Sequence, residues 1–500
     1  MKIVFVCWGQ ESLAIEYLSA VLKKAGYETE LIFDPALFDS FIFNNPLLRK
    51  FFDKTNLLIE EIIAAKADLV CFSVVSDIYG WAVKLAQEFK QRCQVPIIFG
   101  GIHASSVPEI VINRDCVDYV CVGEGEEALL ELVKALDAGQ DTTIIPGIWA
   151  KRKGSIVANQ VREIKNNLDD LPFPDKELFY KKYRGFIKDI YWVSSSRGCV
   201  YQCSFCCHSF FKKLYPAGKK FFRERSIENV ITELKWAKEK YKIKKVCFVD
   251  DLFISGKERI KLFLNRYKDE INLPFACEVH PLQVDEEIVG WLSEAGCATV
   301  GMGIQTISEE LRKNVLNRGG SNEKIKVVLA AFKKTKIFLF AEIIIGIPGQ
   351  DEEELLSIVK FFAEHEVDFV LPLWLRYYPR IDIIGIAQDK GILSAEDIKD
   401  IENSEEFKPV SIKGNSFSKE IGQLCNMMLL VQFIPKFISQ WIILHKLYRY
   451  FPANTFTVLR LTSVIVGSIK RIRFGKKRFM YLSLGGNLRA YAYFVVKHLF

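Results

Sequence analysis

Short apolar runs alternate with amphipathic stretches along the first 140 residues. The run at 2–7 is followed by a segment with Leu13, Ile15, Leu18 and Leu22 at helical spacing. Further apolar runs lie at 29–33, 69–73, 96–99 and 118–122, and helical stretches lie near 56–65, 82–92 and 126–136. This alternation predicts a doubly wound domain of parallel strands over residues 1–140, with its ligand outside the carboxyl ends of the strands.

The residues that follow the predicted strands are candidates for binding that ligand. They are Gln10, Glu11, Ser12, Ser73, Gly100, Gly101, His103, Gly123, Glu124 and Gly125. Glycine at a strand end permits close approach of the backbone to a bulky ligand. Each of these glycines also suits an ordinary turn, and His103 also suits a polar strand end.

A second alternating region begins at residue 191. Residues 141–190 read as a linker that contains a hairpin at 148–151 and 155–158, and prolines 172 and 174 mark the domain boundary. Six apolar runs follow, at 191–195, 245–249, 275–279, 298–303, 338–345 and 369–374. With helices between them, they predict a partial (β/α)6 barrel over 191–385, whose active site lies at the carboxyl ends of the strands. Residues 386–500 are predicted to be mainly helical.

Three cysteines follow the first of these barrel strands. Cys199, Cys203 and Cys206 have the spacing C-x3-C-x2-C. Three thiolates on one loop can hold three irons of a [4Fe–4S] cluster, whereas a fully protein-ligated cluster takes four, so one iron would stay open. Buried structural cysteines are the alternative. The adjacent Cys207 leaves the third ligand ambiguous on chemistry alone.

This loop resembles the signature of the radical S-adenosylmethionine (SAM) superfamily, and the family spacing selects Cys206 over Cys207. The resemblance implies that the open iron binds SAM. One electron, from a low-potential donor such as flavodoxin or ferredoxin, then cleaves SAM to a 5′-deoxyadenosyl radical. By position in the family, the SAM contacts are Phe205, Asp250, Gln305 and Glu342. Asp250 reads equally as a helix N-cap.

The first domain resembles the cobalamin-binding domain that precedes the barrel in one radical SAM subfamily. The matching segments are 99–104 (Phe-Gly-Gly-Ile-His-Ala), 108–109 (Pro-Glu), 122–126 (Val-Gly-Glu-Gly-Glu) and 171–175 (Leu-Pro-Phe-Pro-Asp), and the resemblance covers roughly residues 1–385. The D-x-H-x-x-G motif is absent, so the resemblance implies cobalamin without a histidine from that motif on cobalt.

Together the two resemblances imply a cobalamin-dependent radical SAM enzyme. A C-methyltransferase that acts on an unactivated carbon of a small-molecule or lipid-like substrate is the first expectation. An oxidative cyclase or other enzyme that modifies a tetrapyrrole or lipid is the alternative within the family. A non-catalytic iron–sulfur and cobalamin sensor is the alternative from another class; it would form no 5′-deoxyadenosine from SAM.

The amino-acid composition indicates the class of protein and the cellular compartment in which we expect it. Of the 500 residues 50% are hydrophobic and 26% charged, which is typical of a globular protein of several domains. The opening residues read as a strand, not as a signal peptide. Apart from the one cluster the 13 cysteines are scattered, which favours a reducing, cytoplasmic location.

The C-terminal region is basic and apolar. Residues 421–500 contain 12 Lys or Arg and no Asp or Glu, which leaves 56 basic against 61 acidic residues, a net −5, in the first 420. An interfacial helix could carry Phe433, Phe437, Trp441 and Leu444 on one face, with basic clusters at 470–473 and 476–478 meeting anionic head groups. A helical cap on the barrel is the alternative. Nothing in the region matches an RNA-binding motif.

Overall fold

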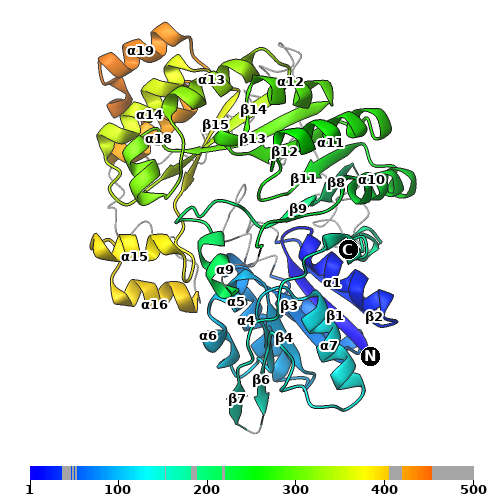
Figure 1. Cartoon of the computed structure of the whole chain (residues 1–500). Coiled ribbons are helices and arrows are strands. Elements are labelled where there is room, and N and C mark those ends of the chain that lie inside the picture. The colour runs from blue at the N-terminus through cyan, green and yellow to red at the C-terminus, as the bar shows by residue number, and fades with distance from the viewer. Residues whose placement is uncertain are drawn as a thin grey trace.

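The structure is a computed structural model of the 500-residue chain, and it describes residues 1–36, 47, 50, 53–152, 154–181, 189–216, 220–404 and 419–452. Two α/β domains lie one above the other, the first in blue and cyan and the second in green and yellow (Figure 1). Helix α9, His208–Leu214, and the ribbon of strands β9, Ser196–Arg197, and β10, Arg223–Glu224, lie where the two domains meet.

The first domain is a doubly wound sheet, as the sequence predicts. Its parallel strands are β1 Lys2–Trp8, β2 Glu28–Asp34, β3 Leu69–Ser73, β4 Ile97–Gly100 and β5 Tyr119–Cys121, in the order β2-β1-β3-β4-β5. Successive strands are added to one side of β1 and then to the other, so the strand order reverses between β1 and β3. Folds of this kind bind their ligands at such a switch point. Both faces are covered, so the central residues Ile3 to Val6 are at most 2% exposed.

Helices cover the two faces of this sheet in separate sets. Helices α1 Leu13–Lys24 and α7 Glu126–Asp137 pack on one face. Helices α3 Thr55–Ala64, α4 Ser76–Lys90 and α6 Pro108–Ile112 pack on the other. The short helices α5 Ile102–Ser106 and α6 lie between the predicted strands at 96–99 and 118–122, where the sequence pattern indicated no element. Five residues span too few turns for helical periodicity to be visible.

The predicted hairpin extends the sheet of the first domain. Strand β6, Ile148–Arg152, pairs antiparallel with β5, and β7, Ser155–Val157, pairs antiparallel with β6. The sheet therefore has seven strands and ends in an antiparallel edge. After it, α8, Glu177–Tyr180, leads to the second domain.

The second domain is the expected six-stranded parallel barrel. Its strands are β8 Ile190–Val193, β11 Lys245–Phe248, β12 Phe275–Val279, β13 Cys297–Gln305, β14 Phe338–Ile345 and β15 Phe369–Trp374, paired in sequence order. Its outer helices are α10 Ile227–Tyr241, α11 Lys257–Glu270, α12 Glu286–Glu294, α13 Asn322–Lys333 and α14 Glu352–Glu364. Outward side chains such as Val246, Val300 and Leu339 form the main core with these helices. The inward Cys247, Ala276 and Ala298 form a separate small cluster.

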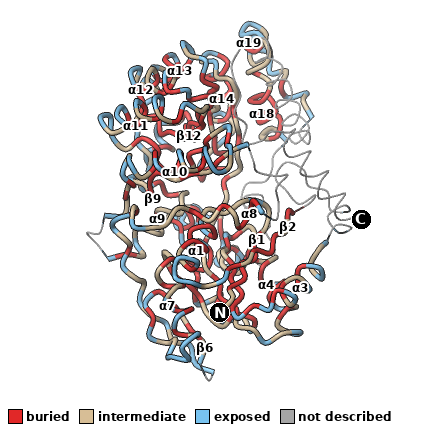
Figure 2. The backbone as a smooth tube through the Cα atoms, turned by 90° about the vertical axis from the view of Figure 1, so that its right-hand side faces the viewer, coloured by how far each residue is buried: buried red, intermediate tan, exposed pale blue. Residues whose placement is uncertain are grey.

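Helices follow the barrel, also as predicted. They are α15 Asp382–Asp389, α16 Ala395–Asn403, α18 Lys419–Leu430 and α19 Lys436–Leu444. Helix α18 belongs to the barrel core, because Leu424, Met427 and Met428 are fully buried there, and the tube of Figure 2 shows it in red. Within the described residues, no helix combines the length and apolarity that a membrane crossing needs. The predicted basic clusters at 470–473 and 476–478 lie outside the described residues.

Candidate functional site

The cysteine loop runs from the β9–β10 ribbon to helix α9. Gly198 begins it with a φ of +80°, and a Cβ there would lie 2.7 Å from the carbonyl oxygen of Phe221. Only glycine fits so close to the opposite strand. The ammonium group of Lys212, on α9, donates to the carbonyl oxygens of Val200 and Tyr201 at 2.9 and 2.6 Å. The loop is therefore closed onto its own following helix.

The segment before helix α13 also holds this loop. The backbone N–H of Ser204 donates to the carbonyl oxygen of Leu316 at 3.0 Å, and its hydroxyl donates to Val315 at 2.5 Å. The amide of Asn317 donates to the carbonyl oxygen of Gln202 at 2.8 Å. The loop is thus fixed over the carboxyl end of β13, at the mouth of the barrel.

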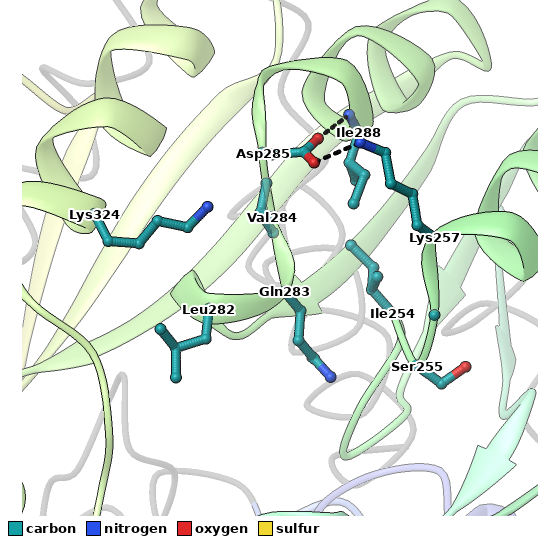
Figure 3. A pocket seen from close by; sticks show the side chains of 10 residues that line it. Ile254, Ser255, Lys257, Leu282, Gln283, Val284, Asp285, Ile288 and Lys324 are labelled. Atoms are coloured by element: carbon teal, nitrogen blue, oxygen red, sulfur yellow. Dashed lines mark hydrogen bonds and ion pairs between the residues drawn. The ribbon is translucent and has the colours of Figure 1, made fainter.

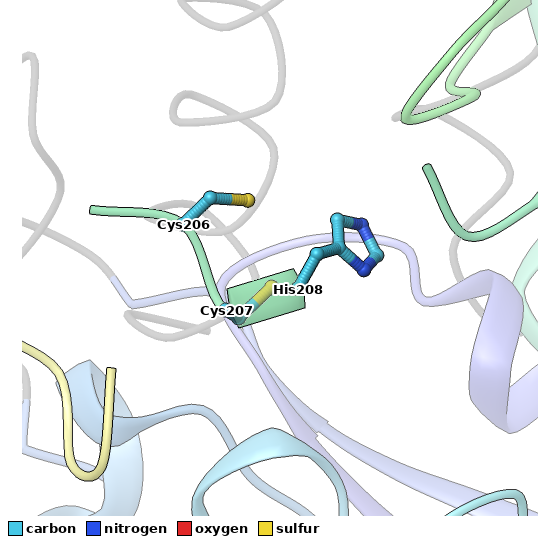
Figure 4. Close-up of side chains that lie close together, drawn as sticks. All are labelled: Cys206, Cys207 and His208. Atoms are coloured by element: carbon cyan, nitrogen blue, oxygen red, sulfur yellow. The ribbon is translucent and has the colours of Figure 1, made fainter. Parts of the chain in front are cut away.

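The last cysteine of the loop lies beside two other metal-binding side chains. The ligand atoms of Cys206, Cys207 and His208 all lie within 4.8 Å of one another (Figure 4). A hydrogen bond with Cys207 lowers the pKa of Cys206 to about 6, despite burial, and the charge of His208 acts in the same direction. The pKa of Cys207 is raised. The hydrogen-bonded pair therefore contains one readily ionised thiol, and thiolate is the form that binds iron.

Two carboxylates face the interior of the barrel. Ala276 belongs to the inward cluster, and Glu278, two residues on, points to the same side of β12. Glu342 lies between Ala341 and Ile343 of the outer core and therefore also points inward. Glu278 is paired in register with Gly301 and Glu342 with Gly303, so no side chain of β13 stands between the two glutamates at these positions.

The pKa values of both glutamates are raised. Burial, reinforced by the charge of Glu342, raises the pKa of Glu278 to about 8. Burial also raises the pKa of Glu342, although Arg318 and the Gln305 amide act against it. Glu278 has no hydrogen bond or ion pair to any residue that the structure describes. Buried carboxylates with strongly shifted pKa values concentrate at functional sites. No sequence motif marked Glu278 as such a residue.

Asp250 organises the backbone below the cysteine loop. Its Oδ1 accepts hydrogen bonds from the N–H and hydroxyl of Ser195 and from the hydroxyl of Ser196, at 2.6 to 2.9 Å. Helix α11 begins only at Lys257, so Asp250 does not cap it. Phe205 packs against the apolar cluster of α15 and the barrel mouth. The roles of Phe205, Asp250, Gln305 and Glu342 in SAM binding stay predictions.

A cavity of about 360 Å³ lies at the strand ends of the first domain and reaches the barrel. Its lining includes six of the predicted strand-end residues: Ser73, Gly100, Gly101, Gly123, Glu124 and Gly125. Helix α1 adds Leu13 and Tyr17, and the barrel adds Ser194, Arg197 and Val249. The helical periodicity of α1 predicted that it packs on the sheet, but not that it lines a cavity. No sequence pattern predicted that residues of the barrel would line the same cavity.

The other strand-end candidates have protein partners of their own. The Ser12 hydroxyl accepts from Ile15 as the N-cap of α1. Glu11 binds the buried Lys176 at 2.6 Å. The Gln10 carbonyl oxygen accepts from the Cys7 thiol at 3.3 Å. None of these three residues lines the cavity, and their contact to a ligand stays a prediction.

His103 is fully buried beside helix α4. Its Nδ1 lies 2.9 Å from the Ser76 hydroxyl, and its ring stacks on Tyr79 with centroids 4.1 Å apart. Burial lowers the pKa of His103 to about 3, so the imidazole is neutral. It is not part of the cavity lining. The contact of His103 with cobalamin stays a prediction.

Two arginines of the β9–β10 ribbon hold the glycine-rich loop after β5. Both guanidinium nitrogens of Arg223 bind the Glu124 carboxylate, at 2.6 and 3.0 Å. Arg197, two residues before Cys199, binds Glu126 at 2.6 Å. The Tyr215 hydroxyl accepts from the N–H of Glu124 at 3.2 Å. The cysteine loop and the cavity of the first domain are therefore joined by charged contacts across the domain interface.

A second cavity, of about 220 Å³, opens between the loops after β11 and β12 (Figure 3). Lys257 crosses its edge to Asp285 at 2.8 Å, and Lys324 points toward the same side (Figure 3). Lys257 and Asp285 neutralise each other, which leaves the positive charge of Lys324 in the lining. No sequence prediction fell on this cavity.

The residues present fit the two cofactors that the sequence implies. Three thiolates on one fixed loop are the right donors for an iron–sulfur cluster. In the first domain Gly101 has a φ of +92°, and a Cβ there would lie 2.7 Å from the Val74 backbone. Glycine at this position lets the end of β4 pack closely against the Val74 backbone, and Gly101 itself lines the cavity. Cys199, Cys203 and Cys206 would hold the cluster, and the lining from Ser73 to Gly125 would hold the corrin.

Family comparisons agree with this division of the chain. Residues 193–362 match the family model of the radical SAM superfamily, and residues 10–133 match that of the B12-binding domain. The chain belongs to the radical SAM proteins that carry a B12-binding domain. The sequence prediction of both domains is confirmed.

Curated relatives match much of this chain at low identity. An uncharacterised methyltransferase of Pyrococcus horikoshii is 30% identical over 300 residues, covering 59% of this chain and 63% of the relative. An anaerobic magnesium-protoporphyrin IX monomethyl ester cyclase of Rubrivivax gelatinosus is 24% identical, covering 73% of this chain and 64% of the relative. The match thus spans slightly less than two thirds of the length of each.

Solved structures show the same fold. The methyltransferase TsrM of Kitasatospora setae, with cobalamin and a [4Fe–4S] cluster bound, aligns with a TM-score of 0.61 at 20% identity, over 77% of this chain and 75% of TsrM. The radical SAM enzyme OxsB, with aqua-cobalamin and SAM bound, aligns with a TM-score of 0.62 at 15% identity, over 96% of this chain and 82% of OxsB. At these identities the likeness concerns the arrangement of the B12-binding and radical SAM domains.

Proposed function

We propose that this radical SAM protein is a cobalamin-dependent C-methyltransferase that acts on an unactivated carbon of a small-molecule or lipid-like substrate. One observation carries the proposal: the cysteine loop and the open strand ends of the B12-binding domain lie at one interface, joined by Arg197 and Arg223. When bound, the cluster with SAM supplies a hydrogen-abstracting radical, and cobalamin supplies the methyl group.

The chain itself contributes position and shielding. Cys199, Cys203 and Cys206 hold the cluster at the mouth of the barrel. The inward face of β12 to β14 offers Glu278, Gln305 and Glu342 as polar groups for SAM or substrate. A reductant of low potential, such as flavodoxin or ferredoxin, completes the proposed reaction.

One relative is named a methyltransferase and another a cyclase, so the experiment must distinguish methylation from ring closure. Both a methyltransferase and a cyclase match this chain over more than half its length. Methylation adds one CH₂ to the substrate mass, whereas ring closure adds none. The anaerobically reconstituted protein would be supplied with hydroxocobalamin, a chemical reductant and SAM that carries a deuterated methyl group, together with an extract of its native cells. A product that gains the labelled methyl group supports methylation.

The sensor hypothesis makes the opposite prediction for SAM. A protein that only senses would bind the cluster and cobalamin and form no 5′-deoxyadenosine on reduction. Formation of 5′-deoxyadenosine by the reconstituted protein, and its loss in Cys203→Ala, supports an enzyme. Absence of 5′-deoxyadenosine from a protein with a full cluster, SAM and reductant would contradict the proposed function.

We further propose that helix α19 docks on an anionic membrane surface. Phe437, Trp441 and Leu444 are 71%, 56% and 75% exposed on this one short helix. Exposed apolar side chains at helical spacing are typical of interfacial helices. The basic excess of residues 421–500 gives this region the charge that anionic lipids attract. An enzyme at that surface could reach a lipid-like substrate.

A further inference from the structure

The loop between β13 and α13 brings a cation to the cysteine loop. Arg318 follows Asn317, whose amide holds the cysteine loop at Gln202. The Nη1 of Arg318 donates to the Sγ of Cys203 at 3.4 Å. Cys203 is the middle cysteine of the motif and is only 6% exposed. A guanidinium group keeps its positive charge at any ordinary pH.

The same guanidinium group is fixed from a second side. Its Nη2 donates to the carbonyl oxygen of Gly303, on β13, at 2.5 Å. A Cβ at position 303 would lie 3.1 Å from this Nη2, so the glycine makes room for the arginine. The Glu342 carboxylate, on the next strand, feels the charge of Arg318. Arg318 thus links the cluster-binding loop with the strands that are predicted to bind SAM.

Charge and hydrogen bonding at a ligand sulfur set the potential of an iron–sulfur cluster. The reduced cluster carries one more electron than the oxidised cluster, so a nearby positive charge stabilises the reduced form. Among the described residues, Lys212 is a second cation in contact with the loop, but its ammonium group binds carbonyl oxygens. Among the described contacts, the hydrogen bond from a cation to a motif sulfur comes from Arg318.

We propose that Arg318 is a positioning residue that fixes Cys203 and raises the reduction potential of the cluster. The inference rests on the proposed function, because it requires that Cys199, Cys203 and Cys206 hold a [4Fe–4S] cluster. It goes further in assigning to Arg318 an electrostatic role that its place outside the cysteine motif does not reveal. A less negative reduction potential of the cluster would make electron transfer from the donor more favourable.

The test is an anaerobic redox titration of the reconstituted full-length protein, followed by electron paramagnetic resonance of the reduced cluster. Three variants are compared with the wild type. Arg318→Gln removes the charge, and Arg318→Lys keeps the charge without the forked geometry. Asn317→Gly is the matched control: it removes a neutral contact to the same loop, and glycine retains the positive φ of 47° found at Asn317.

The expected result is a midpoint potential that is more negative in Arg318→Gln, close to wild type in Asn317→Gly, and between the two in Arg318→Lys. An unchanged potential in Arg318→Gln would overturn the inference. Equal shifts in Arg318→Gln and Asn317→Gly would also overturn it, because loosening of the loop would then explain both. If Arg318→Gln does not retain iron, the iron content of Arg318→Lys decides. Iron retained in Arg318→Lys supports the electrostatic role of Arg318, whereas iron lost in both variants contradicts that role.

Iron and sulfide content separates this test from that of the proposed function. A wild-type protein that assembles no [4Fe–4S] cluster contradicts the proposed function itself. A wild-type protein with a full cluster, together with an unmoved potential in Arg318→Gln, contradicts the role of Arg318 alone.

Discussion

Arg223 and Glu124 form a two-point ion pair between the radical SAM domain and the B12-binding domain. The arginine is 4% exposed and the glutamate 25%. Burial by itself would raise the pKa of Glu124, but the hydrogen bonds from Arg223 and the charge of Arg197 lower it overall. Since 99 residues separate the partners, the pair fixes the loop after β5 against the ribbon that begins the cysteine loop.

Arg223→Gln should therefore weaken both the domain interface and cobalamin binding. Removing one partner of a fully buried pair costs about 3–5 kcal/mol, and partial exposure of Glu124 should bring the loss of unfolding free energy to about 1–3 kcal/mol. Urea denaturation measures the stability, and titration with hydroxocobalamin measures the affinity. Arg266→Gln, which breaks the exposed pairs with Glu228 and Glu270, is the control. Equal effects of the two variants on cobalamin affinity would contradict a role for the interface.

The three motif cysteines should be needed together for SAM cleavage. Alanine at Cys199, Cys203 or Cys206 removes one thiolate of three, and 5′-deoxyadenosine formation should fall to the background level. Cys207→Ala should retain iron and sulfide, although the loss of its hydrogen bond should raise the pKa of Cys206. Iron and sulfide analysis with product quantification checks both expectations. Full activity in Cys203→Ala, or loss of the cluster in Cys207→Ala alone, would show that the ligands are assigned wrongly.

Cobalt should lack an imidazole ligand from His103. Its ring is buried, bonded to Ser76 and stacked on Tyr79. Electron paramagnetic resonance of the protein with Co(II) cobalamin should show no nitrogen splitting that depends on this residue. His103→Ala removes packing and should lower thermal stability while leaving the cobalt spectrum unchanged. A nitrogen splitting that vanishes in His103→Ala would overturn this expectation.

Stability should depend on pH through Glu278. Its pKa is about 8 in the folded chain and about 4.3 in an unfolded chain. Between these values the folded state binds more protons than the unfolded state, so the free energy of unfolding falls as the pH rises, by up to about 1.4 kcal/mol per pH unit. Glu278→Gln removes this loss, and its stability relative to wild type should grow from pH 5 to pH 8.

Chemical denaturation of the cofactor-free protein at several pH values measures this difference. Glu258→Gln, at an exposed position on helix α11, is the control, and its difference from wild type should stay constant. A constant difference for Glu278→Gln as well would show that the inward carboxylate does not hold a proton in this range.

Membrane docking through α19 should be sensitive to its apolar face. The double variant Phe437→Ala/Trp441→Ala should bind less well to anionic vesicles, because both side chains are exposed and available for insertion. Leu262→Ala, an exposed apolar position on α11 of the barrel, should bind like wild type. Binding should also weaken as salt rises, because the Debye length falls from about 30 Å at 0.01 M to about 10 Å at 0.1 M. Co-sedimentation with anionic and neutral vesicles measures each effect, and equal recovery of all three proteins would refute docking through α19.

Local pattern determined the elements and the cysteine motif. Strands β3, β12, β14 and β15 have the bounds that the hydrophobic pattern predicts, because a strand covered on both faces is mostly apolar along its length. Cys199, Cys203 and Cys206 lie within eight residues, so their joint chemistry is visible in the sequence. The order of glycine-rich strand ends likewise placed Ser73, Gly101 and Gly123 at one edge, where the cavity is found.

Only the tertiary structure decided what surrounds those motifs. Arg318 lies 115 residues from Cys203, and Arg223 lies 99 residues from Glu124, so no local spacing connects either pair. The inward direction of Glu278 follows from the closure of the barrel, since an isolated strand has no inside. Burial then sets the pKa of Glu278 and of His103, because the cost of a buried charge depends on every element packed around it. The sequence by itself thus determines which side chains can do the chemistry, and the packing of distant segments determines their charge, their partners and their distance from one another.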